Sequence, residues 1–115
     1  MIDYNKEFIS ALSTILPTYH ELTLHSGIKT PCTSYQELNN YAIEEGDTLG
    51  YSIVSFQVKV WGNDIAQLME YAKKIDTKVR PLGFKRTSSG ELYDRNSSMI
   101  QKILTYEATA LETFD

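Results

Sequence analysis

Few side chains in this sequence stand at spacings that suit metal binding. His20 and His25 lie five residues apart on a stretch whose apolar alternation predicts a strand, so they would point to opposite faces and suit surface positions better than a metal pair. Glu44, Glu45 and Asp47 could bind a cation, but they lack the spacing of a calcium loop. A solvated or partner-facing acidic loop explains them better, and we expect neither a metal nor a cofactor.

Catalytic motifs are equally hard to find. The single cysteine, Cys32, excludes an intrachain disulfide and a cysteine-rich zinc site. The sequence has no Gly-x-Ser-x-Gly motif for a nucleophilic serine and no glycine-rich phosphate loop. Lys85 and Arg86 could contact phosphate, although two charges on a hairpin more often face solvent or an acidic neighbour. The residues therefore favour a protein that is not an enzyme.

Charge is unevenly distributed along the chain. The 115 residues carry a formal net charge of −4, which argues against a protein that coats nucleic acid over its whole surface. Residues 1–50 hold seven acidic side chains against two lysines, whereas six of the eleven basic side chains fall between Lys73 and Arg86. One acidic and one basic region suit contact with another copy of the chain or with charged neighbours, and two solvated faces are the alternative.

The first residues and the apolar runs predict where the protein is made and kept. The opening segment, MIDYNKEF, has neither the basic start nor the apolar stretch of a signal peptide. No apolar run approaches the roughly 20 residues that a helix needs to span a bilayer. We expect a soluble protein that starts in the cytoplasm and has no membrane partner.

Apolar periodicity predicts two helices. The first is expected over residues 3–17, where Asp3 can cap the free amides and Pro17 ends the helix. The second begins at Asn63 or Asp64 and is closed by the pair Pro81 and Gly83. Its buried stripe is expected to consist of Ile65, Leu68, Met69, Ala72, Ile75 and Val79, and Glu70 is expected to pair with Lys74 one turn later.

Alternating residues predict an antiparallel sheet. The clearest strand covers residues 51–62, in which Val54, Phe56, Val58 and Val60 face one way. The other strands are predicted over 19–25, over 32–43, over 84–87 and 91–94 around a Ser88–Gly90 turn, and over 99–114. The class is thus α+β: one domain over 1–115, with a mainly antiparallel sheet, two helices packed on it, and a long protruding hairpin around the acidic loop.

Aromatic residues gather in the predicted hairpin region. Tyr35, Tyr41, Tyr51 and Trp61 occupy positions that are not obviously in the core. Aromatic side chains with a polar tip are enriched at protein interfaces, but a small two-faced core uses them as well. Interface and core therefore both stay open for these four.

Several segments occur in an order that resembles one protein family. They are Pro31–Asn40 (PCTSYQELNN), Tyr51–Gly62, the helix after it, Leu82–Asp94 (LGFKRTSSGELYD) and Lys102–Ala108 (KILTYEA). Taken together, the chain resembles tail completion proteins, the small tail-terminator or tail-to-head joining proteins of long non-contractile-tailed bacteriophages and prophages. The most specific feature is Leu-Gly-Phe-x-Arg-Thr after an amphipathic helix, followed by Glu-Leu-Tyr, and residues 1–30 match less well.

The resemblance implies a structural virion protein. Such proteins assemble as a hexameric ring on the head-proximal end of the tail tube, stop tube polymerisation and dock onto the head-completion or connector protein. Genome DNA passes through the lumen without sequence-specific binding, and no reaction or cofactor is involved. The resemblance therefore implies a location at the head–tail junction of the virion and in the host cytoplasm during assembly, with the tail tube protein as a further partner.

A ring needs a heterologous contact in which two different patches of one subunit meet. We expect the arm of residues 31–50 to reach a neighbouring copy or the tube, and Arg86 to pair with an acid. The interface candidates are Tyr35, Glu37, Asn40, Tyr41, Glu44, Glu45, Asp47, Trp61, Lys85 and Arg86.

Two alternatives share the same sequence features. One is another head–tail connector component, such as a head-closure or adaptor protein, which would use the same ring geometry. The other is a small nucleic-acid-binding regulatory domain that would bind DNA in a salt-sensitive way through the basic residues between Lys73 and Arg86.

Overall fold

The central strand of the protein explains how its layers are built. In the computed structural model, which describes residues 1–25, 27–46 and 49–113, β3 (Leu49–Gly62) buries Val54, Phe56, Val58 and Val60 completely on one face. β2 (Cys32–Glu44) and β5 (Met99–Thr113) pair with β3 in antiparallel register on its two sides. The sheet order is β1-β2-β3-β5-β4, with β1 (Thr18–His20) and β4 (Lys85–Asp94) at the edges. The predicted α+β class and its mainly antiparallel sheet are confirmed.

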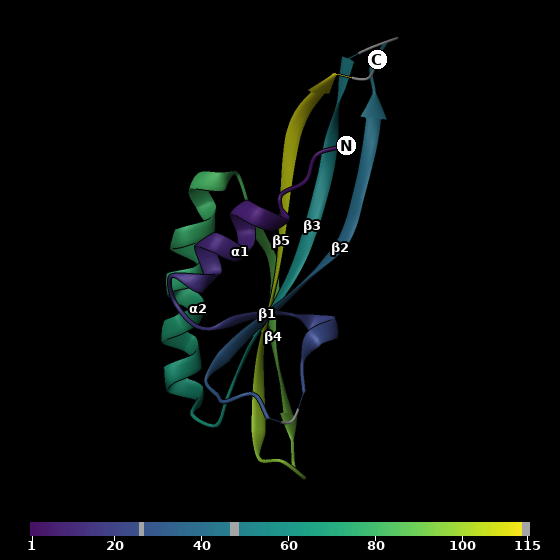
Figure 1. Cartoon of the computed structure of the whole chain (residues 1–115). Helices are drawn as coiled ribbons and strands as arrows, with labels where there is room; N and C mark the ends of the chain where they lie inside the picture. Colours follow the sequence, from purple (N-terminus) through teal and green to yellow (C-terminus); the bar gives the residue numbers. More distant parts are fainter. Residues whose placement is uncertain (26, 47–48, 114–115) are drawn as a thin grey trace.

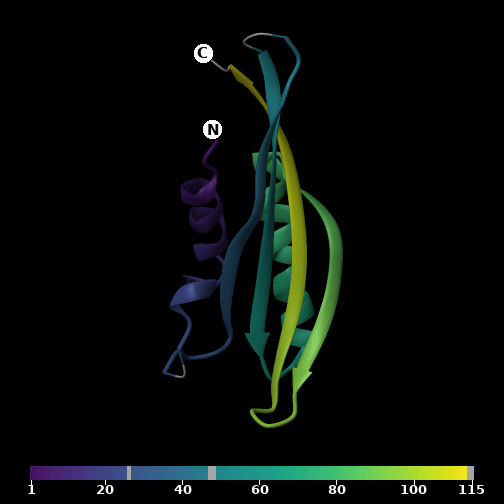
Figure 2. The ribbon, with the colours of Figure 1, turned by 90° about the vertical axis from the view of Figure 1, so that its right-hand side faces the viewer.

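Both helices lie on the same side of the sheet (Figure 1). α1 (Asn5–Ser13) and α2 (Ile65–Val79) pack against each other and against the inner strands. The opposite side, turned toward the viewer in Figure 2, carries no helix longer than the 3-10 turn η1 (Glu21–Thr23) in the described part of the chain. We call this side the uncovered face.

Aromatic rings pack α1 against the sheet. The Phe8 ring of α1 stacks on Phe56 of β3 with centroids 4.4 Å apart, and Phe84 meets Phe8 edge-on at 4.9 Å. Tyr106 of β5 and Tyr4 complete this group. Phe8, Phe56 and Tyr106 expose no more than 1% of their surface, so this group is the centre of the core.

Each helix departs from its prediction in detail. α1 ends at Ser13 rather than at Pro17, because the Thr14 hydroxyl donates to the Ala11 carbonyl and the following amides close a turn. Asp3 accepts a hydrogen bond from the Asn5 amide at 2.9 Å but does not cap the helix itself, whose first flanking residue is Tyr4.

In α2, Asp64 rather than Asn63 is the cap, and its carboxylate accepts from the amides of Ala66 and Gln67. The predicted buried stripe holds for four of its six members, whereas Ile65 and Met69 are 41% and 43% exposed. After α2, the 3-10 turn η2 (Arg80–Leu82) ends at Gly83, whose φ of 97° favours glycine.

Two predicted strands are wrong in extent. The 19–25 strand stops at His20, because the His20 ring accepts the Leu22 amide and turns the chain into η1. The predicted Ser88–Gly90 turn is strand: β4 runs unbroken through it, with a register shift between Arg86 and Ser88, and the chain reverses only after Asp94.

At one end of the molecule, three strands continue past the helices (Figure 1). This distal end comprises residues 39–45, 49–53 and 109–113, in which β2 and β5 both flank β3, with Glu44 opposite Gly50 and Leu49 opposite Thr113. The predicted long hairpin arm does not stand alone there, since β5 accompanies β3 throughout. Whether this end reaches a partner stays a prediction.

None of the helices within the described ranges is long and apolar enough to cross a membrane.

Candidate functional site

The predicted interface residues separate into buried, half-buried and exposed groups. Tyr35 is 7% exposed and packs edge-on against His20 at 5.2 Å, so it belongs to the core of the isolated chain, and its contact with a partner stays a prediction. Trp61 is half-buried, and its indole nitrogen donates to the Ser34 hydroxyl at 2.9 Å. Contacts within the chain therefore account for the positions of both aromatic side chains.

The Trp61 contact belongs to a polar cluster on the uncovered face. The Glu21 carboxylate accepts from the Ser34 hydroxyl at 2.6 Å and from the Lys59 ammonium at 2.8 Å, and both charged side chains are about one-fifth exposed. The Lys59 ammonium also lies 5.8 Å from the Trp61 ring centroid. The cluster fixes η1 against β2 and β3, and the sequence alone could not pair Glu21 with Lys59 across 38 positions.

Glu37 and Asn40 have partners within the chain. The Asn40 amide nitrogen donates to the Ile2 carbonyl at 2.7 Å and to the Glu37 carboxylate at 3.2 Å. This ties the first residues of the chain to the distal end. Glu112 reinforces the link by pairing with the N-terminal ammonium group and accepting from the Ser52 hydroxyl, contacts that hold the pKa of its carboxyl below the usual range.

The exposed candidates include the acidic turn. Glu44 and Glu45 are both exposed, and within the described residues neither forms an ion pair. The Glu45 amide donates to the Leu49 carbonyl at 2.7 Å, which closes the turn between β2 and β3. Asp47, the third predicted acid, lies outside the described residues. We refer to Glu44 and Glu45 as the acidic pair.

The uncovered face displays apolar side chains that no other part of the described structure buries. Tyr41 is 50% exposed, Leu92 is 57% exposed and Leu111 is 89% exposed, each at a strand position that alternates away from the helices. Tyr41 and Leu111 lie near each other at the distal end, whereas Leu92 lies toward the other end of the sheet, opposite Gln101, so the three residues are separate exposed positions on one face. Of these, only Tyr41 is among the predicted interface residues; the exposure of Leu92 depends on the full length of β4, which was predicted as two short hairpin arms.

Arg86 pairs with an acid of its own chain. Its guanidinium donates to Asp76 at 2.5 Å, and the Tyr106 hydroxyl donates to the other oxygen of the same carboxylate at 2.5 Å. Burial of the hydroxyl, followed by its bond to Asp76, raises the pKa of Tyr106 well above the ordinary value. Asp76 is the only acid between Lys73 and Arg86, so the sequence alone could have suggested it as the partner of Arg86. Lys85, one residue earlier, is exposed and points to the other side of β4.

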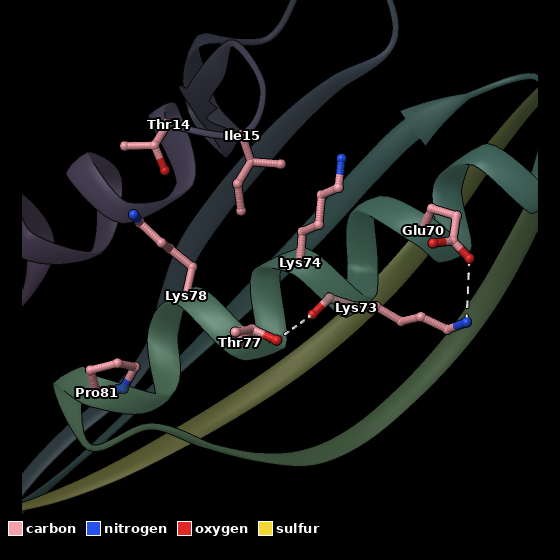
Figure 3. A pocket seen from close by; sticks show the side chains of 8 residues that line it. All are labelled: Thr14, Ile15, Glu70, Lys73, Lys74, Thr77, Lys78 and Pro81. Carbon is pink, nitrogen blue, oxygen red and sulfur yellow. Dashed lines mark hydrogen bonds and ion pairs between the residues drawn. The ribbon is translucent and has the colours of Figure 1, made fainter.

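A groove lies beside α2, where the chain leaves α1 (Figure 3). It has a volume of about 710 Å³ and is lined by the two residues that follow α1, by α2 and by η2. We call it the lysine groove. Its lining residues are Thr14, Ile15, Glu70, Lys73, Lys74, Thr77, Lys78 and Pro81.

The two histidines and the cysteine, which could act in catalysis, already accept hydrogen bonds or are buried. The rings of His20 and His25 each accept a backbone amide two residues ahead, at 3.1 Å. Cys32 is buried, and this burial raises the pKa of its thiol, which disfavours the nucleophilic thiolate. Among the described residues, no group of three or more potential ligands is placed to hold a metal ion.

No protein-family model matches this chain, and no curated protein matches it either.

Proposed function

We propose that this chain is a structural virion protein that forms a hexameric ring at the head-proximal end of a phage tail tube. The ring ends tube polymerisation, joins the tail to the head connector and lets DNA pass through its centre. The protein acts by binding alone, as a partner of its own copies, of the tube protein and of the head-completion protein. The sequence resemblance to tail completion proteins motivates this proposal, and the shape and charge of the subunit support it.

The observation that carries the proposal is the two-sided character of the subunit. One side of the sheet is covered by helices, whereas the other displays Tyr41, Leu92 and Leu111 to solvent. The acidic pair and the lysine groove are likewise different surfaces with opposite charge. A subunit with distinct patches is suited to the head-to-tail contacts that close a ring.

The sheet edges support the same mode of association. β1 pairs with β2 only over Thr33–Tyr35, so beyond that point no strand of the described residues lies beside the outer backbone groups of β2. β4 forms the opposite edge, and all ten of its residues are exposed. Unpaired edges are ready templates for pairing with another chain. Two different free edges on one sheet therefore favour association between copies.

The dimensions of the subunit fit a ring around DNA. The molecule measures 52 × 25 × 23 Å. Six equal cylinders set side by side around an axis enclose an opening as wide as one of them, here 23 to 25 Å. This is wider than a DNA double helix. The formal net charge of −4 suits a lumen through which DNA slides without adhering.

A complementation experiment tests the proposal. Cells that assemble the particles are deprived of this chain, and tails are measured by negative-stain electron microscopy. We expect overlong tubes and DNA-filled heads without tails, and the supply of wild-type protein restores joined particles. Joined particles with normal tails in its absence would contradict the proposal. Unjoined tails of normal length would instead indicate a head-closure or adaptor protein, because such a component does not end tube growth.

A further inference from the structure

Two of the lysines that line the groove have no acidic partner among the described residues. Figure 3 shows Lys73 directed toward Glu70, whereas Lys74 and Lys78 extend into the space beside α1; the Lys73 ammonium lies 3.3 Å from the Glu70 carboxylate. Within the described ranges, no carboxylate lies at ion-pair distance from Lys74 or Lys78. The Lys74 ammonium instead lies 5.6 Å from the Tyr71 ring centroid. The groove thus presents two cationic groups that are free to receive an anion.

The groove is shaped for a side chain or a turn and not only for a free ion. Ile15 and Pro81 contribute apolar surface, and most of the surface that lines it is carbon. The Thr77 hydroxyl already donates to the Lys73 carbonyl and the Thr14 hydroxyl to the Ala11 carbonyl, so the two hydroxyls use their protons locally. A partner that combines a methylene stem with a carboxylate, such as glutamate, matches both the apolar and the cationic parts.

We propose that the lysine groove of one copy receives the acidic pair, Glu44 and Glu45, of the neighbouring copy. This inference rests on the ring proposed above and names its subunit contact. The acidic pair is exposed at the turn between β2 and β3, and no residue of β2 or β3 lines the groove of the same chain. The two surfaces are therefore apart within one subunit and available to meet between two. Their opposite charges fix which surface faces which.

Nucleic acid is a weaker match for this groove. A phosphate backbone is normally followed by a stripe of several unpaired cations. In the basic region, Lys73 is paired with Glu70 and Arg86 with Asp76, and of the four cations that form no ion pair among the described residues only Lys74 and Lys78 line the groove. Lys74 and Lys78 are the two groove lysines without a carboxylate among the described residues, and Glu70 places a negative charge at the groove's own rim. A short acidic turn fits two cations better than a long polyanion does.

Charge reversal with rescue tests the contact in the complementation assay. The groove variant carries Lys74→Glu and Lys78→Glu, the turn variant carries Glu44→Lys and Glu45→Lys, and the swapped variant carries all four changes. We expect each two-site variant to lower the number of joined particles about a hundredfold, because reversal replaces attraction by repulsion. The swapped variant restores the correct pairing between copies and recovers most of the particles. Lys6→Glu with Lys29→Glu, a matched reversal of two exposed lysines elsewhere, leaves the number unchanged.

Disulfide trapping provides an independent readout that does not depend on the swapped variant folding. Glu45→Cys and Lys78→Cys are introduced into separate copies, which are co-assembled and oxidised. We expect crosslinked pairs between the two, and none when Lys6→Cys replaces Lys78→Cys. The native Cys32 is buried and does not compete.

Three results would overturn the inference. They are normal assembly by both reversed variants, a swapped variant that folds but assembles no better than the two-site variants, and absence of the expected crosslink from wild-type-like rings. In each case a ring at the head–tail junction would leave the proposed function intact. Salt-dependent binding of a short labelled DNA duplex, lost in the groove variant, would assign the groove to nucleic acid instead.

Discussion

The same three strands build two very different regions of this molecule. Where α1 and α2 cover the sheet, the inward positions carry large apolar side chains such as Phe56 and Tyr106, and they are completely buried. At the distal end, the inward positions of the same strands are small or polar, as in Gly50 and Ser52 of β3. Ser52 is nevertheless only 1% exposed.

The difference shows that one strand is held in place by different contacts in its two halves. Large inward residues hold the helices by apolar burial, which is the main source of stability. The distal end is held by strand pairing and by the contacts of Asn40 and Glu112 with the first residues. Substitutions in the covered region should therefore change stability, whereas exposed substitutions at the distal end should change assembly.

The largest effect on stability is expected at the centre of the core. Phe56→Ala removes a ring that stacks on Phe8 and lies against Phe84, and it should lower the free energy of unfolding by about 3–5 kcal/mol. Urea denaturation followed by circular dichroism measures the change. A loss below about 1 kcal/mol would mean that α1 is not held to the sheet by this stack.

A smaller effect is expected from the buried hydroxyl of Tyr106. Tyr106→Phe removes the donor to Asp76 and should lower the free energy of unfolding by about 1–2 kcal/mol near neutral pH. Burial holds the folded-state pKa of Tyr106 above its ordinary value of 10.0. The hydroxyl's contribution is thus fully present below pH 10 and is lost as pH rises above it, because the unfolded chain then releases a proton that the folded chain keeps.

Measurement of the free energy of unfolding of the wild-type protein and of Tyr106→Phe at several alkaline pH values separates the titration of Tyr106 from that of the other tyrosines. The difference in free energy of unfolding between the wild-type protein and Tyr106→Phe should shrink as pH is raised above 10. Equal dependence of the two proteins on pH would contradict the assignment of Tyr106 as a buried, neutral donor.

The start of α2 gives a prediction of about 1 kcal/mol. Asp64→Ala removes the acceptor for two backbone amides and should cost about that much, whereas Asn63→Ala should leave stability unchanged. The two variants form a matched pair, because the sequence alone allows either residue as the cap. Thermal unfolding measures the stability of each. A larger loss in Asn63→Ala would reverse the assignment.

The smallest effect on stability is expected on the uncovered face. Leu111→Ala and Tyr41→Ala change exposed side chains of the distal end and should alter the free energy of unfolding by less than about 0.5 kcal/mol. If this face meets a partner, the same variants should reduce the number of joined particles. Reduced stability with normal assembly would mean that the distal end belongs to the folding region after all.

Much of the fold could be predicted from local sequence patterns. The alternation in β3 and the helical stripe of α2 survive in the structure because both elements are long and half-buried, so that periodicity reports burial directly. The errors lie where a polar contact overrides the pattern. The His20 ring turns the chain into η1, and Ser88–Gly90 is held as strand by pairing with β5, which no local rule anticipates.

The candidate site could be predicted only in part. The exposed acidic pair and the basic stretch were visible from charge alone, but their partners were not, because Asp76 meets Arg86 and Tyr106 only after the chain has folded. The lysine groove depends on the end of α1 lying beside α2, a contact between segments about 60 residues apart. The burial of Tyr35 could not be predicted, because an aromatic residue in a polar stretch gives no indication of which face it occupies.

The most direct measurement of the central claim is the location of the protein on assembled particles. A tagged copy, visualised by electron microscopy of purified particles, should appear as a ring of six subunits where the tail meets the head. Particles that lack the tagged protein, or that carry it elsewhere, would contradict the proposal that this chain ends the tail tube and joins it to the head.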